Sequence, residues 1–375
     1  MTPTPLSILD LAPISSGGTV AGALRNTIDL ARRADRLGYH RYWLAEHHLV
    51  PGVASAAPAV LIGLVAAATR RIRVGSGAVQ LGHQTALAVV EQFGTIDALH
   101  PGRIDLGLGR SGHRRAEFAA KATAAPEPGR TGARTVNGLL IPPPFVPTRV
   151  AGSPLLALTD FLLRQPEAQS PDFVQQVDDI LALIEGTYRS AEGTQAHAVP
   201  GEGADLQLWI LGSSGGQSAQ VAGERGLPFA ANYHVSPATV LEAVDAYRAA
   251  FKPSASLAAP HVLVSADVVL AADEDTAREL ASPYGLWVRS IRTGAGAIPF
   301  PTPAEAAAHR WSDEDRRLVA DRLDTQFVGT PPAVAGKLRV LAEATAADEL
   351  LVTTITHDHH DRVRSFELLA GEWGL

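Results

Sequence analysis

The chain has 375 residues, of which 46% are hydrophobic and 19% charged, and its formal net charge at pH 7 is −7. This composition is typical of a globular protein with a sizeable core, and its scattered basic residues exclude the charge pattern of a nucleic-acid-binding protein. The absence of cysteine excludes disulfides, thiolate nucleophiles and iron–sulfur clusters. Since no apolar run reaches the ~18 residues of a membrane span and residues 1–5 lack an export signal, we expect a cytoplasmic protein that does not enter membranes.

Strands and helices alternate through the first part of the chain. Short apolar runs between turn residues predict strands at 6–11, 42–45, 72–78 and 103–109. Longer runs between them predict helices at 19–37, 58–69 and 86–99, the first capped by Thr19 and ended by Gly38. Successive strand–helix repeats of this kind indicate a parallel sheet or barrel.

The helix predicted at 58–69 is apolar on nearly every side, so both of its faces need a cover. On the outside of a barrel the second cover is most simply another subunit, and we therefore expect a homodimer. A helix buried deep in the core is the alternative.

The alternation stops at residues 111–170, which are rich in Pro, Gly, Ala and Arg. A compact domain rarely keeps ~60 residues of weak structure without a use for them. We interpret this segment as an insertion that forms a lid or part of a substrate pocket. An irregular excursion over the surface is the alternative.

The alternation then resumes to the end of the chain. Helices are predicted at 172–185, from Ser218 to 225, at 237–251, at 273–292 and from 331. Strands are predicted at 206–211, 227–231, 261–270 and 349–355, and a second irregular insertion is expected at 293–312. Eight strands alternating with helices predict an α/β fold, a single (β/α)8 TIM barrel over residues 1–375 with insertions at its C-terminal face.

Candidate catalytic groups follow the second predicted strand, which ends in Glu46, His47 and His48. Parallel barrels present catalytic side chains at the C-terminal ends of their strands. The alternatives are a pair of metal ligands or a structural histidine. A metal-dependent hydrolase that also uses the histidines at 357–360 is a further alternative, although such enzymes typically carry His-x-His on the first strand, and this chain does not.

A candidate anion site is formed by Arg110 and the loop 212–218, which leads into a helix. A guanidinium beside the free amides of a helix start suits a monophosphate. The loop matches neither the P-loop nor the dinucleotide fingerprint, and an internal salt bridge of Arg110 with plain helix capping is the alternative. Gly77 and Ala78 end the third strand and would give an aromatic ligand a flat wall, through an uncommon peptide geometry.

An ordered set of segments resembles the bacterial luciferase-like, flavin-dependent monooxygenases. These segments cover most of the chain outside the two insertions, and the densest is Pro101-Gly102-Arg103-Ile104-Asp105-Leu106-Gly107-Leu108-Gly109-Arg110. The other matching segments are 9–13, 39–48, 71–77, 91–95, 211–214, 327–331 and 349–367.

The resemblance implies a monooxygenase in which reduced FMN reacts with O2 to a peroxyflavin that oxygenates a small organic substrate. It places His47 where the family has its active-site histidine, a residue that manages a proton because its pKa lies near neutrality. It implies a non-proline cis peptide at Gly77-Ala78, below the flavin ring. It also implies a separate NAD(P)H:flavin reductase that supplies the reduced flavin.

Strand-end position and resemblance together define the candidate site. The catalytic residue is His47, and no metal ligand is predicted. The cofactor-binding residues are Glu46, Gly77, Ala78, Arg110, Ser213, Ser214, Gly215 and Ser218. The substrate-pocket residues are His48, His113, Tyr233, His234 and His357.

The chain departs from the family after the third strand, where relatives often read Leu-Pro-x-His-x-Pro and this chain reads Leu81-Gly82-His83-Gln84-Thr85-Ala86. The change is expected to loosen the loop and to alter the polar groups at the flavin's edge. Two further alternatives stay open, a deazaflavin-dependent dehydrogenase that transfers hydride and a flavin-binding protein without turnover. An aldehyde, a ketone or a secondary-metabolite intermediate would each fit as substrate, because a fold does not select a substrate.

Overall fold

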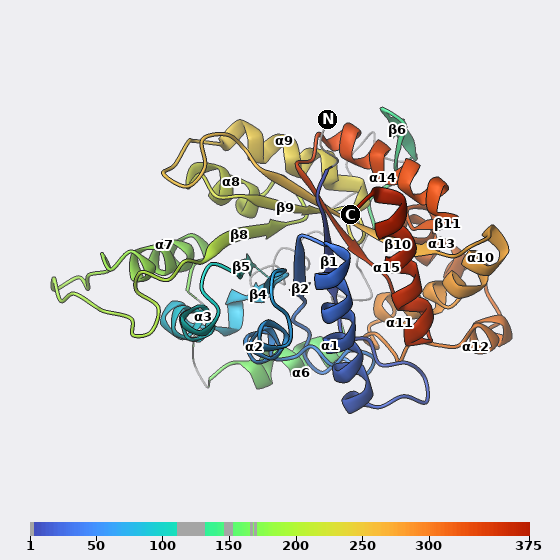
Figure 1. Ribbon diagram of the computed structural model, residues 1–375, viewed down its shortest axis with the longest axis horizontal. Helices are drawn as coiled ribbons and strands as arrows, with labels where there is room; N and C mark the ends of the chain where they lie inside the picture. Colours follow the sequence, from blue (N-terminus) through green and yellow to red (C-terminus); the bar gives the residue numbers. More distant parts are fainter. Residues whose placement is uncertain (1–3, 111–131, 146–152, 166–167, 169–170) are drawn as a thin grey trace.

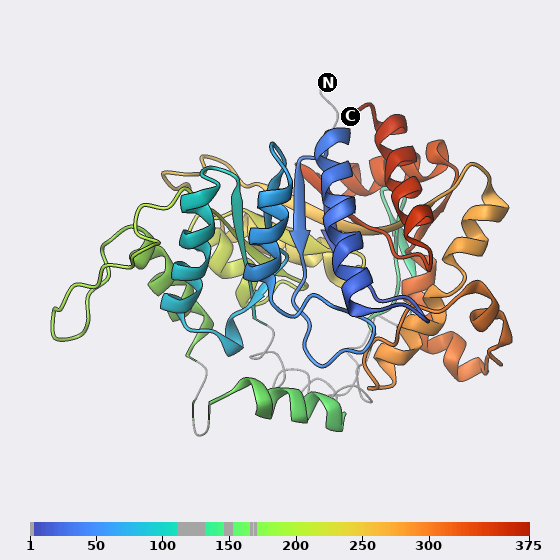
Figure 2. The same cartoon turned by 60° about the horizontal axis from the view of Figure 1, so that its bottom comes forward.

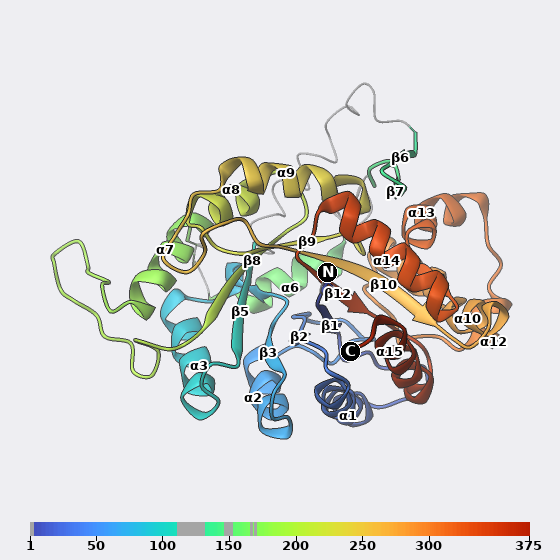
Figure 3. The same cartoon turned by 45° about the horizontal axis from the view of Figure 1, so that its top comes forward.

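Eight parallel strands close into a barrel that is surrounded by helices, in a computed structural model that describes residues 4–110, 132–145, 153–165, 168 and 171–375 (Figure 1; Figure 3). The strands follow the order β1-β2-β3-β5-β8-β9-β10-β12, and β12 pairs with β1 to close the ring. The predicted (β/α)8 barrel is therefore confirmed. No helix in the described ranges is both long and apolar enough to cross a membrane.

The bounds of the barrel strands agree with the predicted strands to within a few residues. The strands are β1 (Leu6–Asp10), β2 (Arg41–Leu44), β3 (Arg73–Ser76), β5 (Ile104–Gly109), β8 (Gln207–Gly212), β9 (Phe229–Asn232), β10 (Val262–Leu270) and β12 (Glu349–Thr353). Two short strands extend the sheet, β4 (Val79–Gln80) beside β5 and β11 (Phe327–Gly329) beside the end of β10.

One helix of the outer layer follows each barrel strand (Figure 3). These helices are α1 (Val20–Leu37), α2 (Pro58–Ala68), α3 (Ala86–Leu99), α7 (Phe173–Ile184), α8 (Gln217–Glu224), α9 (Val240–Ala250), α14 (Pro331–Thr345) and α15 (His359–Trp373). The ends of α1 show why the sequence forms a helix there. The Thr19 hydroxyl accepts a hydrogen bond from the Gly22 amide at 3.0 Å, and Gly38 ends the helix at a φ of +94°.

Side chains on the barrel strands alternate between two cores. One set faces the helices, and the other fills the inside of the barrel. The inner set includes Leu9, Trp43, Trp209, Leu263 and Leu351, all at most 5% exposed. The rings of Trp43 and Trp209 meet edge to face with centroids 5.2 Å apart, so the barrel is packed solid at mid-height.

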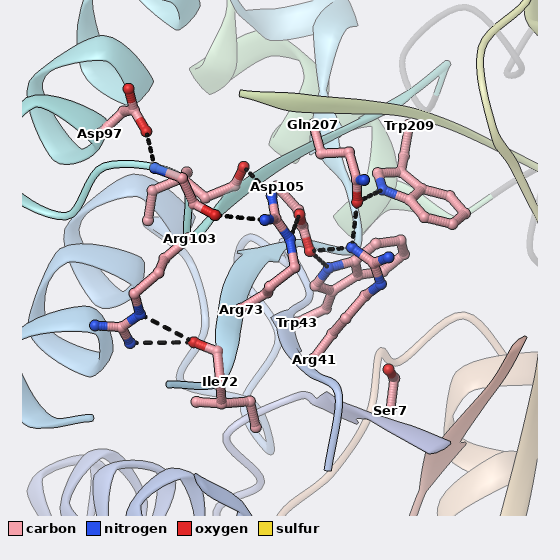
Figure 4. Close-up of polar contacts among 12 residues, drawn as sticks. Ser7, Arg41, Trp43, Ile72, Arg73, Asp97, Arg103, Asp105, Gln207 and Trp209 are labelled. Carbon is pink, nitrogen blue, oxygen red and sulfur yellow. Dashed lines mark hydrogen bonds and ion pairs between the residues drawn. The ribbon is translucent and has the colours of Figure 1, made fainter. Parts of the chain in front are cut away.

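A buried ionic layer lies below these tryptophans, toward the N-terminal ends of the strands (Figure 4). The Arg41 guanidinium donates to Asp105 Oδ2 and to Glu349 Oε1, each at 2.9 Å, and stacks 4.8 Å from the Trp209 ring centroid. Asp105 also accepts hydrogen bonds from Trp43 Nε1 at 2.9 Å and from Arg73 Nε at 2.7 Å. These contacts tie β2, β3, β5, β8 and β12 together at one level.

The first insertion contains more regular structure than its composition predicts. Its described residues form the hairpin β6 (Arg134–Val136) and β7 (Leu139–Ile141) and the helix α6 (Pro154–Leu163), so the expectation of weak structure is wrong for these parts. The hairpin turns at Asn137-Gly138, where both φ angles are positive, a sequence signal that identifies such hairpins. The hairpin packs against α14 and the 3-10 turn η3 (Pro237–Thr239), whereas α6 lies across the C-terminal end of the barrel (Figure 2).

The second insertion and the segments on either side of it also form helices. The helix predicted at 273–292 is interrupted at Pro283 and forms α10 (Glu274–Ala281) and α11 (Tyr284–Arg292), because proline cannot continue the hydrogen-bond ladder. The segment 293–312, expected to be irregular, contains α12 (Pro303–Ala308), and α13 (Asp313–Asp324) follows. Capping boxes at Thr302 and Ser312 begin these two helices and are visible in the sequence.

We predict that Arg41→Met destabilises the fold by about 3–5 kcal/mol, because it leaves the buried carboxylates of Asp105 and Glu349 without their shared cation. Urea unfolding followed by circular dichroism measures this loss. The matched control is Arg25→Met on the exposed face of α1, which is expected to change the free energy of unfolding by less than about 0.5 kcal/mol. Equal effects of the two substitutions would contradict the role of the ionic layer.

Candidate functional site

The chain turns after the C-terminal end of β2, at Glu46, His47 and His48. The Glu46 carboxylate holds this turn together. Its Oε1 lies 2.7 Å from His48 Nε2, and its Oε2 accepts a hydrogen bond from the Gln80 amide at 2.9 Å. The Gln80 side chain returns a hydrogen bond to the Glu46 carbonyl at 2.6 Å. Glu46 is 4% exposed, so these bonds fix the turn between β2 and β4 and hold His48 in place.

His47 is held by its backbone and has a spare ring nitrogen. Its amide donates to the Ser55 carbonyl at 2.9 Å, and its buried Nδ1 has no hydrogen-bond partner among the described residues. Burial lowers the pKa of His47 to about 4, although the Glu46 carboxylate acts in the opposite direction. His47 is therefore a neutral imidazole near pH 7, which can accept a proton or donate one hydrogen bond.

The loop that departs from the family pattern is closed without its prolines. Residues Leu81–His83 form a 3-10 turn, η1, and the Gln176 amide of α7 donates to the Leu81 and Gln84 carbonyls at 3.1 and 2.9 Å. His83 meets the His48 ring edge to face, with centroids 6.1 Å apart. His83 of this loop thus lies beside His48, and Gln176 fastens the loop where looseness was expected.

Arg110 and the start of α8 lie together, as predicted from the order of the strands. Arg110 Nη1 donates to the Gln217 side chain at 2.8 Å, and Gly216 precedes that residue with no side-chain cap on the helix. A Cβ atom on Gly216 would lie 3.5 Å from Ser214 Oγ and 4.0 Å from Arg110 Nη2, so the missing side chain leaves a small hollow beside a hydroxyl and a guanidinium.

The remaining residues of the 213–218 loop face the protein. The Gly215 amide donates to a Glu242 carboxylate oxygen at 3.4 Å, and the Ser213 carbonyl accepts from the Thr239 hydroxyl at 2.5 Å. Ser218 is 6% exposed in the first turn of α8. Ser214, Gly216 and Arg110 are the part of the predicted anion site that surrounds the hollow.

The peptide bond between Gly77 and Ala78 is cis, as the resemblance implied. A Cβ atom on Gly77 would lie 2.9 Å from Leu9 Cδ1 and 3.3 Å from the Trp43 ring, so a larger residue would have to displace these side chains. Ala78 packs beside Gly109 of β5, where a Cβ atom would be 3.2 Å away. Gly77, Ala78 and Gly109 therefore form a wall of small residues between His47 and Arg110 in strand order.

The predicted substrate-pocket residues lie in different places. His234 faces the barrel interior, and its Nδ1 lies 2.6 Å from Ser265 Oγ. Tyr233 lies on the other face of β9, where its hydroxyl donates to the Leu140 carbonyl at 2.7 Å and its ring packs on Phe327. It lines a separate pocket of about 410 Å³ between the hairpin and α14. Tyr233 and His234 therefore do not share a site.

His357 lies on the β1 side of the barrel end. Its Nε2 is 3.0 Å from the Ser16 carbonyl, and its own carbonyl accepts from Ser15 Oγ at 2.5 Å. Both hydrogen bonds of His357 therefore hold the loop after β1 in place. His113 lies outside the described residues.

A group of polar residues near His234 was not predicted from the sequence. Arg322 of α13 donates to the Tyr284 hydroxyl of α11, and the Gln326 amide donates to Asp267 of β10 at 3.0 Å. The capping box at Ser312 predicts the helix that carries Arg322, but no sequence signal places that helix over the barrel. Within the described residues, no group of three or more histidine, aspartate or glutamate side chains is arranged to hold a metal ion.

The fold and these strand ends define an α/β-barrel enzyme with its polar groups at the C-terminal face of the barrel. Comparison with known proteins identifies the family. The family model for luciferase-like monooxygenases matches residues 4–136 and 163–348. The chain belongs to the luciferase-like monooxygenase family, and the predicted enzyme class, a flavin-dependent monooxygenase, is confirmed.

Its relatives cover the chain from end to end. The Bacillus subtilis protein YvbT, itself uncharacterized, is 39% identical over 99% of this chain and 97% of its own length. An Escherichia coli K12 protein described as a luciferase-like monooxygenase is 35% identical over 96% of this chain and 95% of its own. The crystal structure of apo-MsnO8 superposes with a TM-score of 0.79 at 31% identity, covering 100% of this chain and 98% of that one.

Cofactors differ among more distant proteins with this fold. A Pseudomonas putida Baeyer–Villiger monooxygenase solved with FMN has a TM-score of 0.56 at 19% identity, covering 98% of this chain and 97% of its own. An F420-dependent secondary alcohol dehydrogenase has a TM-score of 0.61 at 14% identity, covering 99% of both chains. Flavin and F420 are thus both found on this fold.

We predict that the buried histidine makes the protein sensitive to acid. Unfolded histidine binds a proton near pH 6.5 and folded His47 only near pH 4, so the unfolded state gains protons first and stability falls as the pH drops from about 6.5 to 4. His47→Gln removes this contribution, which amounts to at most about 1.4 kcal/mol per pH unit. Urea unfolding measured at pH 7 and at pH 5 should show that the free energy of unfolding falls less between the two pH values for His47→Gln than for the unchanged protein.

The control for this measurement is His360→Gln, which changes an exposed histidine in the first turn of α15. It is expected to keep the pH dependence of the unchanged protein. If His47→Gln does the same, His47 is not a neutral buried group.

Proposed function

We propose that the protein is an FMN-dependent monooxygenase that uses reduced FMN and O2 to oxygenate a small organic substrate. The observation that carries this proposal is the contact of Arg110 with the start of α8, at the same end of the barrel as the neutral, buried His47. A phosphate site and a proton-handling imidazole at one barrel end match the needs of a flavin that carries a single phosphate.

The phosphate site fits on the grounds of charge and space. Arg110 brings a permanent positive charge, and the uncapped start of α8 brings free amides and the positive end of the helix dipole. The hollow at Gly216 lies beside Ser214 Oγ and Arg110 Nη2. These groups would hold the FMN phosphate.

The flavin ring would lie against the wall formed by Gly77, Ala78 and Gly109, between the phosphate site and His47. Reduced FMN held there would supply the two electrons needed for one oxygen atom of O2 to enter the substrate and the other to leave as water. His47 can hold a proton at Nδ1, which has no partner among the described residues. Glu46 would serve the cofactor indirectly, by fixing the turn that presents His47.

The partners follow from this chemistry. A separate NAD(P)H:flavin reductase would supply the reduced FMN. A B. subtilis N-acetyl-S-alkylcysteine monooxygenase is 51% identical over 106 residues, 28% of this chain and 32% of its own, which supports a small organic substrate. His48, His83 and His234 border the same barrel end and would line the substrate pocket.

Anaerobic titration with reduced FMN, followed by rapid mixing with O2, tests the proposal. We expect saturable binding of reduced FMN and, after mixing, a transient absorbance distinct from both reduced and oxidised FMN. Arg110→Gln should weaken FMN binding by about 10–100-fold, the value of a charge-assisted hydrogen bond, while Arg32→Gln on the exposed face of α1 should have no effect. Preferential binding of reduced F420, with no oxygen consumption, would instead identify a hydride-transfer enzyme.

We also propose that the protein is a homodimer that pairs through α2 and α3. The helix α2 has no polar side chain, and Val60 and Leu64 on it are 64% and 51% exposed. The neighbouring α3 exposes Leu87 and Leu99, at 45% and 73%. An apolar surface of this kind on a folded protein indicates a protein interface.

We predict that Leu64→Glu converts the dimer to a monomer, because it places a charge in an apolar interface. Light scattering after size-exclusion chromatography measures the mass. Val20→Glu, which changes an exposed valine at the start of α1, is the control and should leave the dimer intact. A monomeric unchanged protein, or a dimer that survives Leu64→Glu, would refute this interface.

A further inference from the structure

The inner face of the barrel carries polar side chains at the C-terminal ends of β10 and β12. Strand register pairs Ser265 with Leu351 and Asp267 with Thr353. Leu351 belongs to the core inside the barrel, so its β10 partner and the residues two positions further along face the interior as well. Asp267 and Thr353 therefore stand side by side at the inner rim of the barrel.

Helices α11 and α13, on either side of the second insertion, pack against each other and carry polar side chains to this rim. Arg322 donates to the Tyr284 hydroxyl, which in turn is hydrogen-bonded to Asp267, and Gln326 also donates to Asp267. We call these four side chains the Arg322 cluster. All of them are deeply buried, with exposures of 2% for Asp267, 0% for Tyr284, 7% for Arg322 and 8% for Gln326.

Arg322 differs from Arg41, Arg292 and Arg362, three other buried arginines, in lacking a direct carboxylate partner among the described residues. Arg41 pairs with two carboxylates, Arg292 with Asp321 and Arg362 with Asp10. Within the described part of the chain, no carboxylate oxygen lies within 4.0 Å of the Arg322 guanidinium, and its buried Nε has no hydrogen-bond partner. A buried guanidinium needs hydrogen-bond acceptors for its N–H groups, so the Nε–H of Arg322 is available to a ligand.

Two further buried polar atoms that have no partner in the described ranges border the cluster. Trp287 Nε1 is one of them, and its ring stacks on Tyr284 with centroids 5.9 Å apart. Thr353 Oγ1, beside Asp267 in the strand register, is the other. Three hydrogen-bond donors at one rim therefore have no acceptor in the part of the chain that the structure describes. An oxyanion would supply acceptors for such donors.

The cluster lies next to the proposed flavin pocket. Burial, together with the positive charges of Arg322 and His47, lowers the pKa of His234 to about 3, so His234 lies within electrostatic reach of both residues. Arg110 lies at the end of β5, with β8 and β9 between that strand and β10. Two separate cationic groups therefore border one barrel end, and the phosphate site accounts for Arg110 alone.

We propose that Arg322 binds a carboxylate, or a similar small oxyanion, of the substrate of the proposed monooxygenase, with Trp287 and Thr353 as additional donors. The apolar side chains around this rim, among them Phe300 and Ile355, would pack against the rest of the substrate. The substrate class is then an organic acid with an apolar body. This inference rests on the proposed function, since it assigns the substrate side of the same pocket.

Calorimetric titration of the full chain with hexanoate and with hexanamide tests the inference without flavin or turnover. The two probes have the same length, and only hexanoate carries the charge. We expect hexanoate to bind at least about 10-fold more tightly than hexanamide, the factor for charge-assisted hydrogen bonds. Equal binding of the two probes, or no binding of hexanoate, would overturn the proposal.

Variants then locate the site. Arg322→Gln should remove the preference for hexanoate, whereas Arg316→Gln, which changes an exposed arginine on the same helix, should retain it. If Arg322→Gln fails to fold, Arg322→Lys decides, because it keeps the charge and should weaken hexanoate binding by only about 3–10-fold relative to hexanamide. A preference that survives Arg322→Gln would refute the assignment.

One further arm separates the two possible sources of the anion. If hexanoate occupied the flavin phosphate site, inorganic phosphate would displace it and Arg110→Gln would abolish its binding, and either result would contradict the proposal. We expect hexanoate binding to persist in Arg110→Gln. Failure of the protein to bind reduced FMN would refute the proposed function but would leave the preference for hexanoate, and its dependence on Arg322, as a separate result.

Discussion

A cation enclosed in a barrel is the constraint on which this structure depends. Arg41 lies inside the ring of strands, where water cannot solvate it, and it is compensated by Asp105 from β5 and Glu349 from β12. Removing either partner would leave a buried charge. The three strands must therefore keep their register, and the network fixes the lower level of the barrel.

The levels above follow from that base. Trp43 hydrogen-bonds to Asp105 and packs edge to face on Trp209, so the two indoles close the barrel at mid-height. Gly77 lies against Trp43, where an added Cβ atom would be only 3.3 Å from the indole ring. The polar groups of the candidate site lie above this aromatic layer. The interior thus passes from an ionic layer through an aromatic layer to the functional rim, and each layer positions the next.

The barrel itself was predictable because its strands are apolar runs buried on both faces and its helices begin and end at recognisable caps. The placement of His47 and Arg110 at one end was predictable as well, since both follow parallel strands. What the sequence could not decide was which of two neighbours, Tyr233 or His234, faces the interior, because that depends on strand register. Nor could it place Arg322, which reaches the rim from α13, a helix that lies outside the strand–helix repeat.

We propose above all that the C-terminal end of the barrel binds FMN between Arg110 and His47. A crystal structure of the protein with FMN tests it most directly. We expect the phosphate within hydrogen-bonding distance of Arg110 and Ser214, with the ring against Gly77 and Ala78 and one edge toward His47. A flavin found elsewhere, or one whose phosphate lies against Arg322 instead of Arg110, would contradict it.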